Sequence, residues 1–417
     1  MIIKRDLYLK QLIEGMHNGL IKIITGIRRS GKSYLLFELF GNYLKEHGID
    51  EKHIIKIDLE DRRNAELRNP DALLAHIDAR MTDSGMYYIL LDEVQHVTEF
   101  EDVLNSYLKI KNADVYVTGS NSRFLSSDII TEFRGRGDQI HVYPLSFSEF
   151  MSVDSRHPSD AWNDYYTYGG LPHILTLAND KKKIEYLKEL YSTVYVKDIV
   201  ERYKLKGVAE LKELLLVIAS SIGSPTNPNK LANTFKSLKK VSLSNKTIDN
   251  YLTYICESFL AEKAIRYDIK GKKYINTLSK YYFSDLGIRN AILDFRQQEE
   301  NHIMENIIYN ELKIRGFQVD VGVVEYRTTD AGGKTVRKQF EVDFVANLGS
   351  KRYYIQSAFI MPTDAKERQE SASLLNINDS FKKIIIVKDN IKPKRNEDGI
   401  TTIGLFDFLL NADSLSW

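Results

Sequence analysis

The chain has only one cysteine, Cys256, among its 417 residues. A single cysteine excludes an intramolecular disulfide and any zinc site built from several thiolates, as is usual for proteins of a reducing compartment. Long apolar runs are missing too, so no segment has the length of a membrane-spanning helix. Residues 1–6 are charged and lack the apolar core of a signal peptide. We therefore expect a cytoplasmic protein with no membrane partner.

An excess of charge of one sign is also absent. Lysine and arginine number 58 against 57 aspartates and glutamates, which gives a net charge of +1. No global field therefore draws the chain to nucleic acid, and any such contact must come from a local basic patch. The hydrophobic content of 43% and the charged content of 28% are ordinary for a globular protein. The length suits two or three domains.

What the sequence does contain is a phosphate-binding loop. Residues 26–33 fit the pattern G-x-x-x-x-G-K-S, and they lie between an apolar, strand-like segment (21–25) and a segment with helical spacing of apolar residues (34–40). Strand, glycine loop and helix is the context that such a motif requires. The candidate nucleotide-binding residues are Gly26, Ile27, Arg28, Arg29, Ser30, Gly31, Lys32, Ser33 and Tyr34.

The chemistry of this loop predicts ATP and Mg²⁺ as its ligands. Glycines let backbone N–H groups turn toward phosphate oxygens, and the start of the following helix adds a positive field. Lys32 is expected to contact the β- and γ-phosphates, and the hydroxyl of Ser33 is expected to bind Mg²⁺.

A second part of the site follows the apolar segment 87–91, where Asp92 and Glu93 stand side by side. Such a segment is typical of a central parallel strand, and charged residues at its carboxyl end lie where ligands bind in open α/β sheets. We expect Asp92 to hold Mg²⁺ and Glu93 to orient and deprotonate the attacking water.

Two further residues are candidate catalytic groups. Asn121, with Ser120 as the second choice, follows the strand-like segment 114–118 and can sense the γ-phosphate. Arg136 precedes the strand-like segment 139–142 and can reach a phosphate in its own subunit or in a neighbour, which makes a homo-oligomer a candidate assembly. A simple turn and a surface arginine are the alternatives.

The patterning divides the chain into three predicted domains. Residues 1–205 alternate strand and helix patterns, typical of a parallel sheet between helices, and add a helical stretch after Pro144 that we interpret as a lid. Residues 206–285 show three helical segments and then two alternating, strand-like segments, the order of a winged helix. Between Asn229 and Lys280 there are eleven Lys/Arg and four Asp/Glu. This domain is therefore a candidate for DNA binding, with a protein-contact or structural module as the alternative.

Residues 286–417 follow the order helix, three strands, helix, strand, which is typical of restriction-nuclease-like folds. Such folds hold a catalytic metal with carboxylates and place a lysine beside the attacking water. Glu305, Asp343 and Gln356 can supply metal ligands, but the lysine position is Ala358. We therefore expect a nuclease-like α/β domain without nuclease activity.

Motifs along nearly the whole chain resemble one family. They lie at residues 25–33, 91–95, 118–122, 135–136, 144–150, 169–172, 197–199, 281–287, 305–306, 341–344 and 354–356. The family they resemble is that of bacterial and archaeal ATPases with an AAA-type N-terminal domain (AAA_14) and a C-terminal domain of unknown function, DUF4143. The resemblance implies ATP binding and hydrolysis, and it names no cellular partner.

Together these features predict a Mg²⁺-dependent ATPase of α/β fold, with an AAA-like P-loop domain, a winged helix and a nuclease-like domain. Its C-terminal half is expected to recognise DNA or a protein. One alternative is a nucleotide-gated switch with slow turnover, against which Glu93 argues. The other is an ATP-dependent DNA-processing nuclease, against which Ala358 argues.

Overall fold

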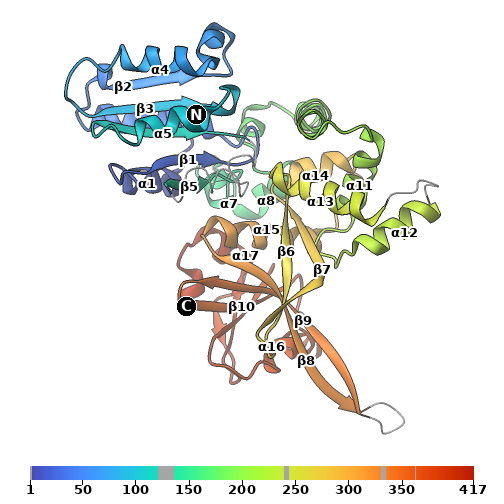
Figure 1. Ribbon diagram of the computed structural model, residues 1–417. Coiled ribbons are helices and arrows are strands. Elements are labelled where there is room, and N and C mark those ends of the chain that lie inside the picture. The colour runs from blue at the N-terminus through green and yellow to red at the C-terminus, as the bar shows by residue number, and fades with distance from the viewer. Residues whose placement is uncertain (1, 121–135, 239–243, 330–334, 362) are drawn as a thin grey trace. The chain divides into compact units, whose positions relative to one another are not determined.

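The computed structural model describes residues 2–120, 136–238, 244–329, 335–361 and 363–417 (Figure 1). The chain forms two compact units. The first contains Met1–Pro144 together with the short segments Leu171–Leu175 and Glu257–Phe259, and the second contains the remainder.

The first unit is built on a five-stranded sheet in the order β2-β3-β4-β1-β5, with every neighbouring pair parallel. Its strands are β1 (Ile21–Thr25), β2 (Ile54–Asp58), β3 (Tyr87–Asp92), β4 (Ala113–Thr118) and β5 (Gly137–His141). Its described helices are α1 (Asp6–Glu14), α2 (Lys32–Tyr34), α3 (Gly41–Glu46), α4 (Pro70–Asp78) and α5 (Phe100–Tyr107), and a π-helical segment, Leu35–Phe40, joins α2 to α3. The predicted parallel α/β sheet is therefore confirmed.

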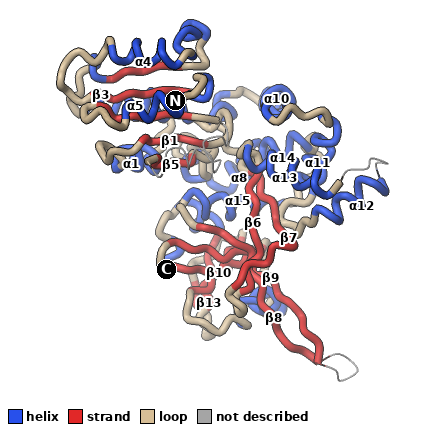
Figure 2. The backbone as a smooth tube through the Cα atoms, viewed as in Figure 1, coloured by secondary structure: helices blue, strands red, loops and turns tan. Residues whose placement is uncertain are grey.

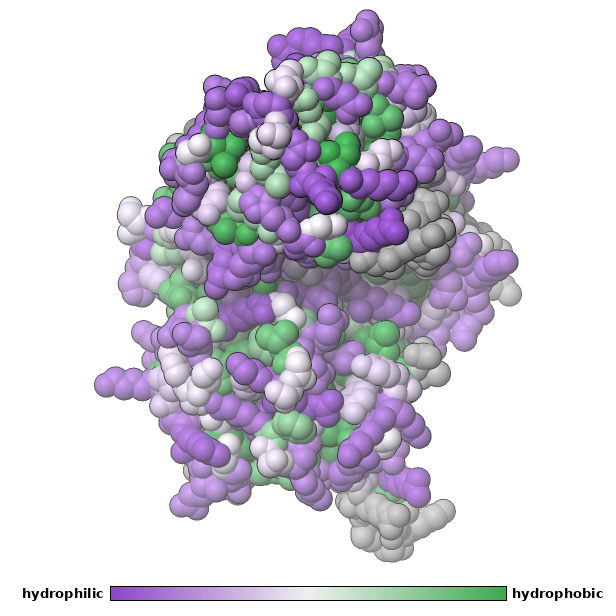
Figure 3. Space-filling view, turned by 60° about the vertical axis from the view of Figure 1, so that its left-hand side comes forward, coloured by the Kyte–Doolittle hydropathy of each residue, from purple (hydrophilic) through white to green (hydrophobic). Residues whose placement is uncertain are grey.

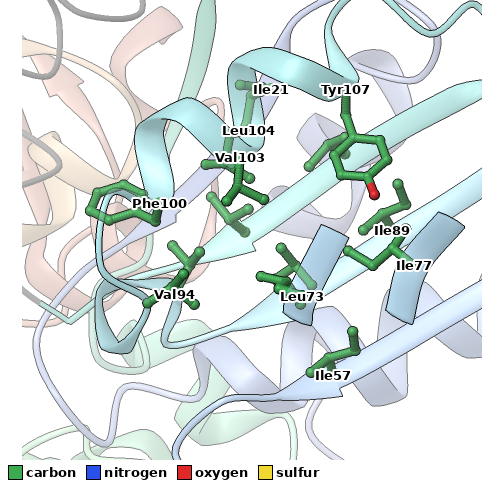
Figure 4. Close-up of a cluster of buried hydrophobic side chains, with 14 of the residues drawn as sticks. Ile21, Ile57, Leu73, Ile77, Ile89, Val94, Phe100, Val103, Leu104 and Tyr107 are labelled. Atoms are coloured by element: carbon green, nitrogen blue, oxygen red, sulfur yellow. The ribbon is translucent and has the colours of Figure 1, made fainter. Parts of the chain in front are cut away.

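Both faces of this sheet are covered by helices. Successive side chains of a strand point to opposite faces. Tyr87, Ile89 and Leu91 of β3 accordingly pack with α4 and α5, whereas Tyr88 and Leu90 pack with α1 and the helix after the P-loop. Figure 4 shows the first cluster, where Leu73, Ile77, Phe100, Val103, Leu104 and Tyr107 of the helices lie near Ile21, Ile57 and Ile89 of the strands. Each such buried side chain contributes about 1.5–3 kcal/mol, so the sheet is a firm support for the loops at its carboxyl edge.

The second unit begins with helices. They are α7 (Phe147–Met151), α8 (Pro158–Tyr168), α9 (Asp180–Glu189), α10 (Val196–Arg202), α11 (Val208–Ser220), α12 (Pro228–Leu238) and α13 (Asn245–Glu257). The predicted helix start after Pro144 is confirmed, since Ser146 accepts from the N–H of Glu149 and the Glu149 carboxylate accepts from the N–H of Ser146. This reciprocal capping satisfies two N–H groups that lack partners within the helix.

The second unit ends in a mixed sheet of eight strands, ordered β12-β13-β11-β10-β9-β8-β6-β7 (Figure 2). The strands are β6 (Ala261–Asp268), β7 (Lys273–Phe283), β8 (Gln318–Thr329), β9 (Thr335–Leu348), β10 (Lys351–Ala358), β11 (Lys382–Val387), β12 (Lys394–Arg395) and β13 (Ile400–Gly404). The helices among them are α14 (Leu286–Ile292), α15 (Glu300–Ile314), α16 (Asp364–Leu375) and α17 (Leu405–Leu410).

The hairpin β6–β7 follows three helices, as the sequence predicts for residues 206–285. It does not stand alone, because β6 pairs in parallel with β8 and so extends the C-terminal sheet across residue 285. The β8–β9 hairpin projects beyond the other strands of this sheet (Figure 1). The face of the protein in Figure 3 is mainly hydrophilic, with hydrophobic side chains scattered between polar ones. Within the described ranges, no helix is long and apolar enough to cross a membrane.

Candidate nucleotide-binding site

The P-loop joins β1 to α2 through residues with left-handed backbone angles. The φ angle is +139° at Gly26, +66° at Arg29 and +95° at Gly31. A Cβ atom at Gly26 would lie 2.1 Å from the carbonyl oxygen of Val142, so no other residue type fits there. The sequence thus places glycine where the loop must turn tightly against its neighbour.

The side chain of Lys32 is folded back onto this loop. It is 4% exposed, and its Nζ donates to the carbonyl oxygens of Gly26 and Ile27, each at 3.1 Å. Burial lowers the pKa of Lys32, and the negative charges of Glu93 and Asp92 oppose that effect without reversing it. Its direct contacts are neutral, so phosphate oxygens are stronger partners that this ammonium can take up.

Other residues of the loop differ in their contacts. Ile27 is buried, Tyr34 is 37% exposed, and the Arg28 guanidinium lies 3.6 Å from the Glu60 carboxylate. The buried hydroxyl of Ser30 has no hydrogen-bond partner among the described residues. An unpartnered polar atom in a glycine-bounded cradle fits a site that takes a polar ligand.

Arg5 supports the loop from the N-terminal segment, a role that no sequence motif indicates. It is 3% exposed and donates to the carbonyl oxygens of Ser30 at 3.2 Å and Tyr143 at 2.6 Å. A buried guanidinium held by carbonyl oxygens fixes the path of both segments.

Asp92 lies at the carboxyl end of β3, beside the start of α2. Its Oδ1 accepts from Oγ1 of Thr118 at 2.5 Å, and its carboxylate is also hydrogen-bonded to the side chain of Ser33. Burial raises the pKa of Asp92 to about 6. The structure therefore brings together the two predicted Mg²⁺ ligands, a hydroxyl and a carboxylate, both of which are oxygen donors of the type that Mg²⁺ prefers.

Glu93 has a left-handed backbone, with φ 52° and ψ 48°. Its N–H donates to Oγ1 of Thr118 at 2.9 Å, and its Oε2 accepts from Oγ of Ser120 at 2.8 Å and from the side-chain amide of Gln95. Burial would raise the pKa of Glu93, but the charge of Lys32 and the bonds from Gln95 and Ser120 outweigh it and lower the pKa. The carboxylate is thus ionised at neutral pH. A non-glycine residue in this conformation is strained and typical of functional positions.

The two remaining predicted catalytic residues are Asn121 and Arg136. Asn121 lies outside the described residues, so the described hydroxyl next to Glu93 is that of Ser120. Arg136 is exposed and directly precedes Gly137, which pairs with Ile21 at the beginning of β1. The P-loop follows the opposite end of β1, about 16 Å away along its five residues. The prediction that Arg136 reaches a phosphate in its own subunit is corrected, and contact in a neighbouring subunit stays a prediction.

Two of the three residues predicted as metal ligands of the C-terminal domain, Glu305 and Asp343, lie near one another. Glu305 on α15 and Asp343 on β9 are buried, and Gln356 lies on the neighbouring strand β10. Ala358 is buried in a hydrophobic cluster, so this position offers no group to a water molecule. Lys280 of β7, which no sequence motif singles out, places its Nζ 2.9 Å from Oε1 of Glu305.

Comparison with known proteins identifies relatives along nearly the whole chain. An uncharacterized protein of Haemophilus influenzae is 34% identical over 415 residues, which cover 98% of this chain and 99% of that protein. One of Methanocaldococcus jannaschii is 27% identical over 421 residues, covering 97% of this chain and 88% of that protein. Residues 18–151 match the family model of the AAA domain AAA_14. The chain belongs to this family of AAA-domain proteins.

The structure of a Walker-type ATPase from Pyrococcus abyssi supports the fold of the AAA-domain protein. It superposes with a TM-score of 0.50 at 16% identity and covers 70% of this chain and 96% of the Pyrococcus chain. Residues 159–299 of the AAA-domain protein match a different family model, the domain of unknown function DUF8612. This match takes the place of the DUF4143 domain that the motifs implied.

Proposed function

We propose that this AAA-domain protein hydrolyses ATP with Mg²⁺. The observation that carries the proposal is the meeting of Ser33 and Asp92 beside Lys32 and Glu93, since the fold thus supplies oxygen ligands for a metal, a cation for phosphate, and an ionised base in one place. A glycine turn without a nucleotide ligand would not need these four side chains in one place.

Each side chain has a separate task in this proposal. Lys32 leaves its carbonyl partners and binds the β- and γ-phosphates, while the P-loop N–H groups hold phosphate oxygens. Ser33 and Asp92 would hold Mg²⁺, which supplies charge neutralisation at the phosphates. Glu93 takes the proton of the attacking water after Ser120 and Gln95 have oriented its carboxylate.

The test compares two substitutions of the full-length chain. Lys32→Ala should abolish detectable ATP binding, whereas Glu93→Gln should keep binding and lower phosphate release by about 10²–10⁴-fold. ATP affinity is measured by calorimetry and turnover by phosphate release under single-turnover conditions. Unchanged turnover in Glu93→Gln would remove Glu93 as the base, and slow turnover in the unsubstituted protein would favour the nucleotide-gated switch.

For the C-terminal half we propose a winged-helix module in residues 206–285, a nuclease-like domain in residues 286–417, and duplex DNA as the partner. Support comes from the exposed basic side chains at the ends of two hairpins that lie side by side. They are Lys270 and Lys272 between β6 and β7, Lys273 at the start of β7, and Arg337 and Lys338 on β9. A groove of about 480 Å³ lies between these hairpins, and Nζ of Lys270 donates to the carbonyl oxygen of Glu325 at 2.8 Å.

This partner is tested by salt-dependent binding to duplex DNA. Replacing Lys270, Lys272 and Lys273 with Gln should weaken binding and lower the salt slope by about 0.9 per lost phosphate contact. The control replaces Lys181, Lys182 and Lys197, which are 64–84% exposed on α9 and α10. No affinity of the unsubstituted protein at low salt would show that the module contacts protein or is structural.

A further inference from the structure

The side chain of Lys280 ends inside a cluster of three carboxylates. Lys280 lies on β7 and is 3% exposed. Its Nζ is 2.9 Å from Oε1 of Glu305, 2.8 Å from Oε1 of Glu341 and 3.9 Å from Oδ1 of Asp343. These carboxylates come from α15 and β9, so one lysine ties three elements of the second unit together.

Other protein groups donate further hydrogen bonds to the cluster. The hydroxyl of Tyr282 donates to Oε1 of Glu305 at 2.6 Å, and the N–H of Ser357 donates to Oδ2 of Asp343 at 2.8 Å. Gln356, the third predicted metal ligand, accepts through Oε1 from Oγ of Ser373 at 3.3 Å. The predicted ligands are therefore already engaged by groups of the chain itself.

The loop after α11 covers the cluster. A Cβ atom at Gly223 would lie 3.0 Å from Oε2 of Glu305, so the main chain passes close to this carboxylate. Thr226 and Ser279 exchange two backbone hydrogen bonds, of 2.8 and 3.2 Å, which hold the loop on β7 next to Lys280. Glu341 remains the most open of the three carboxylates, with 32% of its side chain exposed. The side chain of Glu305 is 11% exposed, so little of it is open to a phosphodiester backbone.

Electrostatics require a cation at this point. The Lys280 ammonium lies 2.8–3.9 Å from all three carboxylates and supplies a positive charge where buried negative charges would otherwise lie together.

We propose that the Lys280 ammonium occupies the place of the divalent cation in the nuclease-like site, so that the Glu305–Glu341–Asp343 cluster is a structural junction closed to metal and to DNA. In the described part of the chain, no group of three or more His, Cys, Asp or Glu side chains is arranged to hold a metal ion. The Lys280 ammonium explains why these carboxylates do not form a metal site. Its N–O distances of 2.8 and 2.9 Å suit an ammonium. Distances from Mg²⁺ to its oxygen ligands are shorter by about 0.8 Å.

The test asks whether a metal ion can replace the lysine. Mn²⁺ binding is counted by electron paramagnetic resonance in full-length Asp92→Asn protein without nucleotide, which silences the nucleotide site. The Asp92→Asn protein should bind the same number of Mn²⁺ ions with and without a further Asp343→Asn change. Adding Lys280→Ala should create one Mn²⁺ site, lost again with Asp343→Asn, and Mn²⁺ should raise the melting temperature of the Lys280→Ala form alone.

Three results would overturn the proposal. The first is a Mn²⁺ site that depends on Asp343 while Lys280 is present. The second is a Lys280→Ala protein that gains no Mn²⁺ site when folded, or that stays unfolded in Mn²⁺. The third is cleavage of plasmid DNA in Mn²⁺ by the unsubstituted protein that Lys280→Ala abolishes, because Lys280 would then be a catalytic residue of an active nuclease.

Discussion

Lys32 and Lys280 are both buried lysines near carboxylates. The two sites differ in which groups contact the ammonium and offset the free-energy cost of burying its charge. Nζ of Lys32 donates to two neutral carbonyl oxygens, and burial lowers its pKa. Nζ of Lys280 lies within 4.0 Å of three carboxylates, and their attraction raises its pKa. A buried charge with neutral partners gains free energy when an anion arrives, whereas one with ionic partners has nothing further to gain.

Backbone strain and unpartnered polar atoms distinguish a binding site from a junction built of similar residues. In the P-loop, the strained angles at Arg29 and Glu93 and the unpartnered hydroxyl of Ser30 are features that stability alone would not favour. Around Lys280, by contrast, Tyr282 and Ser357 donate further hydrogen bonds to Glu305 and Asp343. The P-loop therefore leaves interactions open that a ligand can make, whereas Lys280 and its carboxylates make theirs within the chain.

The largest predicted effect is on the free energy of unfolding when either lysine is replaced. Lys280→Met should lower the free energy of unfolding by about 3–5 kcal/mol, since it leaves buried carboxylates without their cation. Lys32→Met should change it by less than about 1 kcal/mol or raise it, because a poorly compensated charge is removed. Urea unfolding of the second unit is followed by tryptophan fluorescence, since Trp162 and Trp417 both belong to that unit. Hydrogen exchange in β1 and β3 reports the first unit, and equal losses for the two variants would contradict the comparison.

The second prediction concerns pH at the nucleotide site. Because burial raises the pKa of Asp92 to about 6, the folded protein carries a proton there at pH 5 that Mg²⁺ must displace. Apparent Mg²⁺ affinity should therefore fall by up to about tenfold per pH unit below pH 6. The same shift means that stability falls as pH rises from about 4 to 6, since the folded state binds the proton more tightly than the unfolded chain.

The measurement is a Mg²⁺ titration in the presence of ATP from pH 5 to 8, on the unsubstituted protein and on Asp92→Asn. Phosphate groups of the nucleotide titrate in the same range, so the difference between the two profiles is the informative quantity. Parallel profiles would show that Asp92 does not bind the metal.

A smaller effect is expected at Gln95, which we regard as a positioning residue for Glu93. Gln95→Ala removes a hydrogen bond that lowers the pKa of Glu93. The acid limb of the kcat profile should move to higher pH by up to about one unit, the equivalent of a bond of about 1.4 kcal/mol. The exposed Gln139→Ala is the matched control. A fall in kcat without any shift of the pH profile would mean that Gln95 has a structural role instead.

Much of the nucleotide site could be predicted from the sequence because its signals are local. The P-loop pattern specifies its own turn, and the apolar segment before Asp92 and Glu93 specifies a strand whose end carries them. The position of Arg136 could also have been predicted from the sequence. Arg136 precedes its strand, and residues before a parallel strand lie at the edge of the sheet opposite the phosphates. Chain order alone was enough to exclude it from its own subunit's site.

The junction around Lys280 could not be predicted in this way. It needs Lys280, Glu305 and Asp343 to meet from β7, α15 and β9, which are 25 or more residues apart along the chain. The meeting depends on the pairing of β6 with β8, which carries the hairpin into the C-terminal sheet. In the sequence, the alternation of apolar and polar residues predicts the strands β6 and β7, but it does not predict which other strands they pair with. The two segments are therefore typical of an isolated hairpin.

The smallest predicted effect concerns Glu341, compared with Glu305 of the same cluster. Glu341 is 32% exposed, so its bond to Lys280 is screened by water and Glu341→Gln should change the free energy of unfolding by less than about 1 kcal/mol. Glu305 is 11% exposed and also accepts from Tyr282, so Glu305→Gln should have a clearly larger effect in the same tryptophan-detected urea titration. Since the charge of Glu341 also raises the pKa of Asp343, Glu341→Gln should bring that pKa closer to its ordinary value. Equal losses for the two glutamates would mean that charge number, and not burial, holds Lys280 in place.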